Sequence, residues 1–455
     1  MEYTRKLAEF CSNVTLETLP ADVVHKAKLC ILDYVANIYG SLELETVRNI
    51  AAYIRSVGAP GKITALGCGF KTDVHQAAFL NGTTAEAIEA QDGSRFGGNH
   101  PGVAVIPAAL AVAEETGATG GAVIEAVVAG YEAANRPAAA MHPWHTLGGF
   151  LPTGTCGTYG AAVAAARLRG LDADQLLNAL GNAGYLLPLS MAEHLMGGYT
   201  VKVVQGGQAA SAGIMAAGLA GAGVTGAPYV LEGSALNGGF AKITTAADPA
   251  LSRITEGLGA TYSVMDVYFK PYTACRHTHG AAQAALALAA SEAVDLSQVE
   301  GITVYTYGIA KLAVGKGVDA SSSFVSAQFS IPYVVAACLM DGELGPLQLT
   351  EKRISDPAVL ALAARVTVQT DEVLDQIYPD KTSSRVEILF KDGRRLSQQV
   401  DDPWGDPRDP LDAAALTDKV KRFAGDRDHQ KLDEAIDGIL GLEKINDLSR
   451  LLDKI

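Results

Sequence analysis

The sequence predicts a mostly α-helical protein with a second, smaller α+β domain. Apolar residues recur at helical spacing from the start of the chain to about residue 265, where β-branched residues begin to alternate with polar ones. Helical spacing returns after a Pro- and Asp-rich stretch at 401–410. Because 455 residues exceed one ordinary core, we expect an all-helical domain formed by 1–265 plus 405–455 and an α+β domain formed by 266–404.

The clearest helical pattern lies in the segment PADVVHKAKLCILDYVANIYG, residues 20–40. Its apolar side chains step by three and four positions, Pro20 stands near the start, and Gly40 stands where a C-terminal cap belongs. No strand-like alternation competes in this half of the chain. Further helices are predicted at 74–90, 103–116, 121–135, 155–169, 174–184 and 206–222.

Three alternating stretches predict the strands of the second domain, and two stretches with helical spacing predict helices in it. The strands are expected at 299–308, 364–372 and 384–400, and the helices at 279–293 and 329–340. The last strand stretch is typical of a β-hairpin that turns at Asp392-Gly393. The Pro- and Asp-rich stretch is interpreted as a linker, and the helices after it are expected to return to the first domain.

The overall charge and the cysteine pattern exclude several classes of protein. The formal net charge is −14 and no block of Lys or Arg stands out, so we expect no nucleic-acid partner and no membrane partner. No uninterrupted apolar stretch approaches the ~18 residues of a membrane span. Six cysteines without CxxC spacing, and a start without a signal-peptide pattern, predict a cytoplasmic protein with reduced thiols. A small anionic substrate is compatible with this composition.

The stretch QDGSRFGGNHPG, residues 91–102, places Asp92, Arg95 and His100 on a glycine-rich backbone before a buried helix. One interpretation is a structured turn that caps this helix, since glycine and asparagine allow unusual backbone conformations. The other is the rim of an active site, because a histidine beside free helix N–H groups suits a carboxylate substrate.

Two further glycine-rich stretches carry candidate groups. At 141–162 two histidines precede PTGTCG, whose amides and hydroxyls can hold a carboxylate or simply cap a helix; the spacing is not that of a P-loop. At 194–213 Lys202 stands alone in an uncharged stretch, three residues after Tyr199. A solvated lysine is one interpretation, whereas a semi-buried ammonium needs an anionic partner or a shifted pKa.

The fourth candidate is YFKPYTACRHTHGAAQAA, residues 268–285, at the predicted domain junction. Arg276, His277 and His279 lie here with Lys270. The His-x-His pair suggests a metal, but no third ligand stands at suitable spacing, so anion recognition between the domains is the favoured interpretation. Cys275 is interpreted as a packed thiol rather than a nucleophile, since no partner base is evident.

In this order and setting, these stretches resemble the MmgE/PrpD family. The shared motifs are HPG at 100–102, PTGTCGTYGAAVAAARLRGL at 152–171, GGYTVKVVQGGQAASAG at 197–213, KPYTACRHTH at 270–279 and AQFSIPYVVA at 327–336. The resemblance covers nearly the whole chain. It implies a large all-helical domain, a smaller α+β lid domain, a homodimer, and small di- or tricarboxylate substrates bound between the domains. It implies no required metal and no other cofactor.

The resemblance also assigns roles to individual residues. Lys202, His100 and His279 match the family's catalytic positions, and we add His145 and Tyr199 as further acid/base candidates. The side chains expected to contact substrate carboxylates are Asp92, Ser94, Thr153, Thr155, Arg276 and Gln328.

Two departures from the family pattern bear on the reaction. Family lyases carry an Asp-x-Asp-Asp-Thr run before the His-Pro motif, whereas this chain has AQDGS, with Ala90 and Gly93 in place of two aspartates. The family's His-Pro-Thr-Gly-Thr motif begins here with Leu151 instead of histidine, although His145 is near in sequence.

These departures favour an epimerase over a lyase. Expelling hydroxide needs a general acid, whereas epimerisation needs only two groups that exchange protons on opposite faces of one carbon. We therefore expect cofactor-independent proton abstraction α to a carboxylate, giving epimerisation of an iminodisuccinate-like substrate. The alternative is a lyase similar to 2-methylcitrate dehydratase or cis-aconitate decarboxylase. A third interpretation is a helical scaffold or carboxylate-binding module without catalysis.

Overall fold

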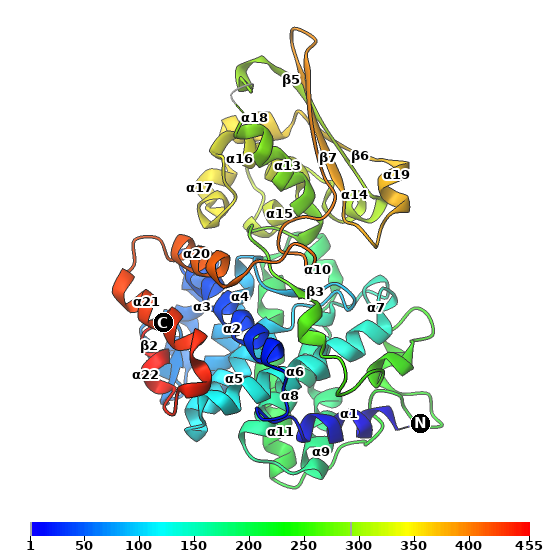
Figure 1. The fold of residues 1–455 in the computed structure, drawn as a ribbon, viewed down its shortest axis with the longest axis vertical. Helices are drawn as coiled ribbons and strands as arrows, with labels where there is room; N and C mark the ends of the chain where they lie inside the picture. The colour runs from blue at the N-terminus through cyan, green and yellow to red at the C-terminus, as the bar shows by residue number, and fades with distance from the viewer. Residues whose placement is uncertain (1, 292–293) are drawn as a thin grey trace.

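The computed structural model describes residues 2–291 and 294–455 and has the predicted fold class. A large helical domain carries a smaller α+β domain, which is at the top of the view in Figure 1. The principal helices of the large domain are α1 (Tyr3–Ser12), α2 (Ala21–Ser41), α3 (Glu45–Val57), α4 (Val74–Ala87), α5 (Gly102–Thr116), α6 (Gly120–Met141), α8 (Pro152–Leu168), α9 (Ala173–Leu186) and α11 (Gln205–Gly221). Each helix predicted in this half of the chain is therefore confirmed, with boundaries that differ by a few residues.

Close approach of helix backbones holds the centre of the large domain together. A Cβ built on Gly160 of α8 would lie only 2.6 Å from the carbonyl oxygen of Gly130 in α6. A Cβ on Gly82 of α4 would lie 2.8 Å from the Cα of Gly207 in α11. No side chain fits at these crossings, so glycine is required there. The glycine-rich composition thus places α4, α6, α8 and α11 close together around the segments that carry the polar residues described below.

The smaller domain is built on one four-stranded sheet of order β6-β5-β7-β8. The strands are β5 (Val299–Thr306), β6 (Val366–Thr370), β7 (Ser384–Phe390) and β8 (Arg395–Val400), with β5 and β6 parallel and the other pairs antiparallel. Alternate residues of β7 are buried, which is the signature of a sheet with one covered face. The predicted hairpin is confirmed, and Gly393 in its turn has a φ of +84°.

The helices of the smaller domain pack on this sheet and on one another. Contacts join α13 to both β7 and β8, and α16 packs against α13. The helices are α13 (His279–Ala289), α14 (Gly308–Val314), α15 (Phe324–Gln328), α16 (Ile331–Asp341), α17 (Glu351–Ile354), α18 (Pro357–Ala363) and α19 (Glu372–Gln376). Both helices predicted here, at 279–293 and 329–340, correspond to α13 and α16, although residues 292 and 293 lie outside the described residues.

The last part of the chain lies beside the first. The helices α20 (Ala413–Ala424) and α21 (His429–Leu440) pack against α2, and α22 (Ser449–Leu452) packs against α21; Figure 1 shows them in orange and red beside the first helices. Inside this contact Lys419 forms an ion pair with Asp33, with 2.6 Å between Nζ and Oδ1, and both side chains are 1% exposed. The same ammonium donates to the carbonyl oxygen of Ala90 at 2.6 Å. The end of the chain thereby supports the segment that precedes Asp92.

One expectation about the backbone is wrong. The first half of the chain contains short strands, because β1 (Ile63–Ala65) pairs with β2 (Phe70–Thr72) and β3 (Gly93–Ser94) pairs with β4 (Val267–Tyr268). Strands of two or three residues are too short to show an alternating pattern.

The stretch at 401–410 connects β8 to α20, and its first part is partly or fully buried, whereas residues 407–410 are exposed. Gly405 accepts a hydrogen bond from the Phe269 amide at 3.0 Å, the Trp404 amide donates to Gln283 at 2.8 Å, and the Asp406 side chain is buried. Its Pro and Asp residues do form turns, but these turns pack against the protein because their polar groups find partners there.

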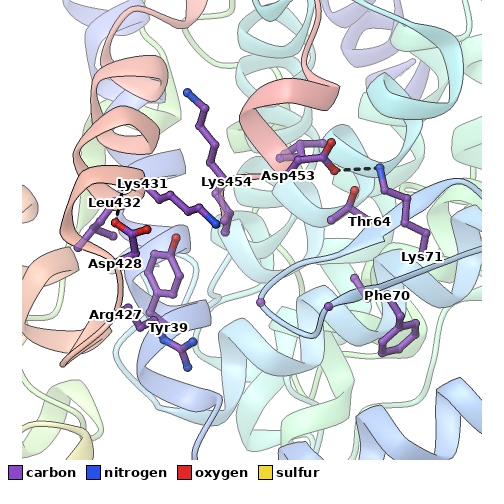
Figure 2. Close-up of a pocket in the computed structure, with 15 residues that line it drawn as sticks. Tyr39, Thr64, Phe70, Lys71, Arg427, Asp428, Lys431, Leu432, Asp453 and Lys454 are labelled. Atoms are coloured by element: carbon purple, nitrogen blue, oxygen red, sulfur yellow. Dashed lines mark hydrogen bonds and ion pairs between the residues drawn. The ribbon is translucent and has the colours of Figure 1, made fainter.

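Two cavities lie near the C-terminal helices. One, of about 560 Å³, lies where β1, β2 and the turn between them face α21 and the chain end, and Lys71 pairs with Asp453 beside it at 3.0 Å (Figure 2). The other, of about 580 Å³, lies between α3 and the same turn. Neither is lined by a residue that the sequence assigned to the site. Among the described residues, no helix is long and apolar enough to cross a membrane.

Candidate active site

Lys202 lies at the centre of a buried cluster of charges. It belongs to the single 3-10 turn Thr200–Val204 that leads into α11, and it is 4% exposed. Its ammonium pairs with Glu89 and, at 3.2 Å, with Glu86. Burial lowers the pKa of this lysine, but the two carboxylates outweigh that effect and raise it above its ordinary value. Lys202 is therefore protonated at neutral pH.

Glu89 joins two lysines. One carboxylate oxygen contacts Lys202, and the other lies 2.7 Å from the ammonium of Lys270, which is fully buried. Burial raises the pKa of Glu89, but the two ammonium groups hold it well below its ordinary value. The residue has a φ of +55°, a left-handed conformation that costs energy for a residue with a Cβ. The chain accepts this strain just after α4, at the residue that connects both cations.

Glu86 is the second carboxylate of the cluster and connects Lys202 to the start of α11. Its carboxylate accepts from the side-chain amide of Gln205 at 2.6 Å and from the Gly206 amide at 2.8 Å, at the start of α11. Burial raises its pKa. Two carboxylates and two ammonium groups thus share one interior region, where charges interact more strongly than in water.

His100 lies next to this cluster in a defined tautomer. Its Nδ1 is 2.7 Å from the carbonyl oxygen of Asp92, so Nδ1 carries the hydrogen and Nε2 keeps its lone pair. Its amide donates to the hydroxyl of Thr153 at 3.0 Å, which ties the loop to the first turn of α8. Burial, together with the nearby charges of Lys270 and Lys202, lowers its pKa to about 3. His100 is therefore neutral at physiological pH.

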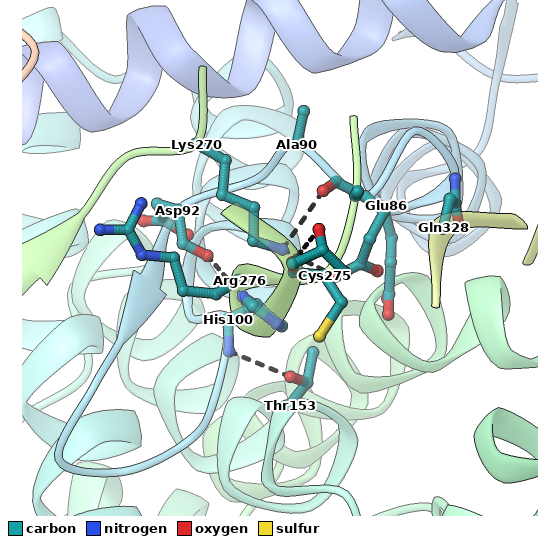
Figure 3. A network of polar contacts seen from close by, with 12 residues as sticks. Glu86, Ala90, Asp92, His100, Thr153, Lys270, Cys275, Arg276 and Gln328 are labelled. Carbon is teal, nitrogen blue, oxygen red and sulfur yellow. Dashed lines mark hydrogen bonds and ion pairs between the residues drawn. The ribbon is translucent and has the colours of Figure 1, made fainter. Parts of the chain in front are cut away.

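Asp92 positions this loop, and each of its carboxylate oxygens already accepts one hydrogen bond. Its carboxylate accepts from the Gly102 amide at 3.1 Å and from the Tyr131 hydroxyl at 2.5 Å. Burial raises its pKa to about 7. The 91–102 stretch thus has features of both predicted alternatives, the helix-capping turn and the rim of a site. Asp92 caps α5, and the same loop brings His100 to the charge cluster (Figure 3).

Arg276 and His279 act as a pair. The guanidinium donates to the carbonyl oxygens of Pro403 and Trp404 at 2.7 and 2.9 Å, and its Nη1 lies 3.4 Å from Nδ1 of His279. Because Nε2 of His279 lies 3.0 Å from the Ala274 carbonyl oxygen, Nε2 carries the hydrogen and Nδ1 accepts. Both nitrogens of this buried imidazole are therefore occupied, and the arrangement suits positioning of Arg276 better than proton transfer.

Gln328 and Cys275 line the same region in Figure 3. The side-chain amide of Gln328 donates to the Ala87 carbonyl oxygen at 2.8 Å, and its backbone oxygen accepts from the Cys275 amide at 3.0 Å. Its Oε1 is buried and has no hydrogen-bond partner among the described residues. Burial raises the pKa of the Cys275 thiol to about 11, which agrees with a packed thiol.

The remaining candidates are outside this group of contacts. The hydroxyl of Thr155 lies 2.8 Å from Nε2 of His145, whose Nδ1 lies 2.9 Å from the Thr244 carbonyl oxygen, so the imidazole joins two segments. Tyr199 is 63% exposed, and its ring packs edge-on against His194. Ser94 is buried in β3 next to the turn. The Tyr199 carbonyl oxygen accepts from the Lys202 amide at 3.1 Å, but none of these contacts brings the side chains of His145, Tyr199 or Ser94 to the Lys202 ammonium.

The contact of His145 gives a prediction about pH. Burial lowers its pKa to about 4, so between about pH 4 and pH 6.5 the unfolded chain binds more protons at this residue than the folded chain. Folded stability at this site is therefore complete above about pH 6.5 and decreases as the pH falls. In His145→Asn the loss of unfolding free energy between about pH 7 and pH 5 is expected to be smaller than in the wild type by about 2 kcal/mol.

Denaturant melts of both proteins at the two pH values measure this difference. The raised pKa of Asp92 makes its own contribution to stability increase as the pH falls. Because Asp92 is present in both proteins, this contribution cancels in the comparison. An equal pH dependence in the two proteins would show that His145 titrates normally in the fold.

Sequence reasoning missed half of the charge cluster. Glu86 and Glu89 were not selected, and Lys270 was noted only as a neighbour of Arg276. A signal was present, because two acids three residues apart interrupt the otherwise uncharged stretch TTAEAIEAQ. Among the described residues, no group of three or more His, Cys, Asp or Glu side chains could hold a metal ion.

Comparison with known proteins places the chain in a family. Residues 5–252 match the MmgE/PrpD N-terminal domain, and residues 272–440 match the MmgE/PrpD C-terminal domain. A cis-aconitate decarboxylase of Aspergillus terreus is 28% identical over 481 residues, which cover 99% of this chain and 95% of that protein. The cis-aconitate decarboxylase of Homo sapiens is 26% identical over 76% of this chain and 72% of its own length. The chain therefore belongs to the MmgE/PrpD family, as its motifs predicted.

Proposed function

We propose that the chain is an enzyme that transfers a proton at the carbon next to a carboxylate of a small di- or tricarboxylate, and that the overall reaction is that of a lyase. The observation that carries this proposal is the buried pair of ammonium groups on Glu89, Lys202 and Lys270, beside a neutral His100. The cations suit the charge that develops on a carboxylate when a proton leaves the adjacent carbon.

The protonation states suggest which residue removes the proton and which residues stabilise the resulting negative charge. The lone pair at Nε2 of His100 can take the carbon-bound proton, while the C–H electron pair moves into the adjacent carboxylate to give an enediolate. Lys202 and Lys270, held protonated by Glu89, would stabilise the enediolate oxygens. In a decarboxylation, the electron pair of the broken C–C bond stays on carbon when CO2 leaves. The protonated Lys202 would then supply the proton that this carbon takes up.

The relatives support the lyase reaction. Those named above are cis-aconitate decarboxylases, and a third, the cis-aconitate decarboxylase-like protein oryM of Aspergillus oryzae, is 26% identical over 98% of this chain. Our sequence-based preference for an epimerase receives no support from them. We therefore propose a decarboxylase- or dehydratase-like reaction on a tricarboxylate as the first candidate.

An epimerase is the second candidate, and one observation favours it. The only aspartate kept from the family's acidic run, Asp92, already accepts hydrogen bonds from the Gly102 amide and the Tyr131 hydroxyl, which hold it to the loop and to α6 and make it less suited to protonate a leaving group. His100 and Lys202 would then be the two groups that exchange protons with one carbon, from opposite faces. An iminodisuccinate-like dicarboxylate fits this chemistry.

Proton NMR in deuterated water separates these candidates. The purified protein is incubated with cis-aconitate, 2-methylcitrate or a single stereoisomer of iminodisuccinate. We expect a new unsaturated product, formed with loss of CO2 from cis-aconitate or of water from 2-methylcitrate. Deuterium uptake at the α carbon without a new C=C bond would replace the lyase by the epimerase. No change in any of the three substrates would favour the non-catalytic scaffold and contradict both.

A further inference from the structure

A second cationic group lies at the other end of the loop that carries His100. Arg95 follows β3, and its backbone position is fixed, because the Ser94 amide donates to the Asn99 carbonyl oxygen and the Gly98 amide to that of Ser94, both at 2.8 Å. The side-chain amide of Asn99 donates in turn to Asn135 of α6 at 2.8 Å. The loop therefore holds the Arg95 backbone in one place.

The Arg95 guanidinium meets the smaller domain at a shared carboxylate. Its Nη1 lies 3.9 Å from Oδ2 of Asp406, and Nη2 of Arg276 lies 3.9 Å from the same oxygen. Arg408 donates to both oxygens of Asp406, to Oδ1 at 2.8 Å and to Oδ2 at 3.2 Å. The distances from Arg95 and Arg276 to Oδ2 exceed hydrogen-bond length. One buried carboxylate thus lies among three guanidinium groups, and only Arg408 is hydrogen-bonded to it.

Arg95 and Arg276 differ in how many of their donors are used. Arg276 donates to the carbonyl oxygens of Pro403 and Trp404 and contacts His279. The Arg95 side chain is 22% exposed, and its N–H groups make no hydrogen bond to any of the described residues. A largely buried guanidinium offers five donors in a fork that matches a carboxylate. The fixed loop therefore presents an unused carboxylate-binding group opposite Arg276.

We propose that Arg95 and Arg276 together bind a carboxylate of the substrate at a distance from the reacting carbon, and that this pair selects polycarboxylates over shorter acids. This inference rests on the proposed function. Arg276 contacts His279 and lies beside His100 and Lys270 in Figure 3, and Arg95 belongs to the loop that carries His100, so the subsite adjoins the Lys202 cluster.

Calorimetric titration with two non-reacting acids tests the subsite. Tricarballylate has three carboxylates, and methylsuccinate is the same skeleton without one terminal carboxylate. For Arg95→Gln we expect tricarballylate affinity to fall about 10-fold or more, the loss of a charge-assisted contact, while methylsuccinate affinity stays within about 3-fold. Arg95→Lys is expected to fall in between, because it keeps the charge but not the fork.

Two controls keep the result interpretable. Arg450→Gln removes an exposed arginine of α22, whose side chain is 90% exposed, and should leave both affinities unchanged. Thermal melts show whether Arg95→Gln remains folded. The inference is wrong if Arg95→Gln changes the two affinities equally or not at all, or if the wild type does not prefer tricarballylate. Binding is measured without turnover, so failure of the proposed reaction and failure of this subsite are distinguishable.

Discussion

Replacing Lys202 by alanine is expected to lower kcat by at least ~100-fold, the low end for a positioned acid/base group. The reason is that Lys202 is one of two ammonium groups on Glu89 and is held protonated inside the protein. Loss of this cation removes both a proton donor and part of the stabilisation of an enediolate. Steady-state kinetics on the substrate found by NMR measure the effect, and tight binding with unchanged kcat would contradict it.

The single variant also leaves buried charge uncompensated, so a second variant is needed. Lys202→Met alone leaves Glu86 and Glu89 facing only Lys270 and is expected to unfold more easily. The double variant Lys202→Met with Glu86→Gln restores equal numbers of acids and bases in the cluster. We expect it to recover thermal stability relative to Lys202→Met but to remain inactive. Recovery of activity together with stability would assign Lys202 a purely structural role.

Replacing Lys419 by alanine is expected to have the largest effect on stability, about 3–5 kcal/mol in the free energy of unfolding. Its partner Asp33 is buried, and burial raises the pKa of Asp33 while lowering that of Lys419, so each charge is acceptable only because the other is present. The variant also frees the carbonyl oxygen of Ala90, next to the Asp92 loop, so activity is expected to fall as well.

A neighbouring lysine provides the matched control. Lys421, on the same helix, pairs with Asp433 at 2.8 Å, but its side chain is 44% exposed. Exposed pairs contribute about 0–1 kcal/mol, so Lys421→Ala should change the melting temperature little. Denaturant unfolding of the two variants compares them directly. Equal stability of Lys419→Ala and Lys421→Ala would show that the buried pair does not hold α20 against α2.

The fold was predictable wherever an element is long and has one buried face. The alternating burial of β7 and the Asp392-Gly393 turn are visible in the sequence because a half-buried hairpin imposes both. The pair β3 and β4 could not be predicted, since two residues define no period. The partial burial of the stretch at 401–410 could not be predicted for another reason. Turn residues predict the direction of the backbone but not whether the protein covers it.

The sequence indicated Lys202 as a candidate site residue, but it did not indicate the two acids that pair with it, Glu86 and Glu89. An isolated lysine in an apolar stretch indicated that Lys202 needs an anionic partner, but Glu89 is 113 residues away in sequence, and only the packing of α4 against α11 brings the two together. His145 is a different case. A histidine near a glycine-rich motif suggested catalysis, whereas its two nitrogens are already bound to Thr155 and Thr244.

The most direct test of the central claim is the deuterium content, after reaction in deuterated water, of the product that cis-aconitate gives by decarboxylation, or of the epimerised substrate if the enzyme is an epimerase, because both reactions return a solvent proton to carbon. Proton transfer by the Lys202 and His100 region predicts that the wild type places solvent deuterium on the carbon next to the carboxylate. The folded double variant Lys202→Met with Glu86→Gln is expected to place none there. A product without deuterium at that carbon, or equal incorporation by the double variant, would contradict the assignment of this cluster as the site of proton transfer.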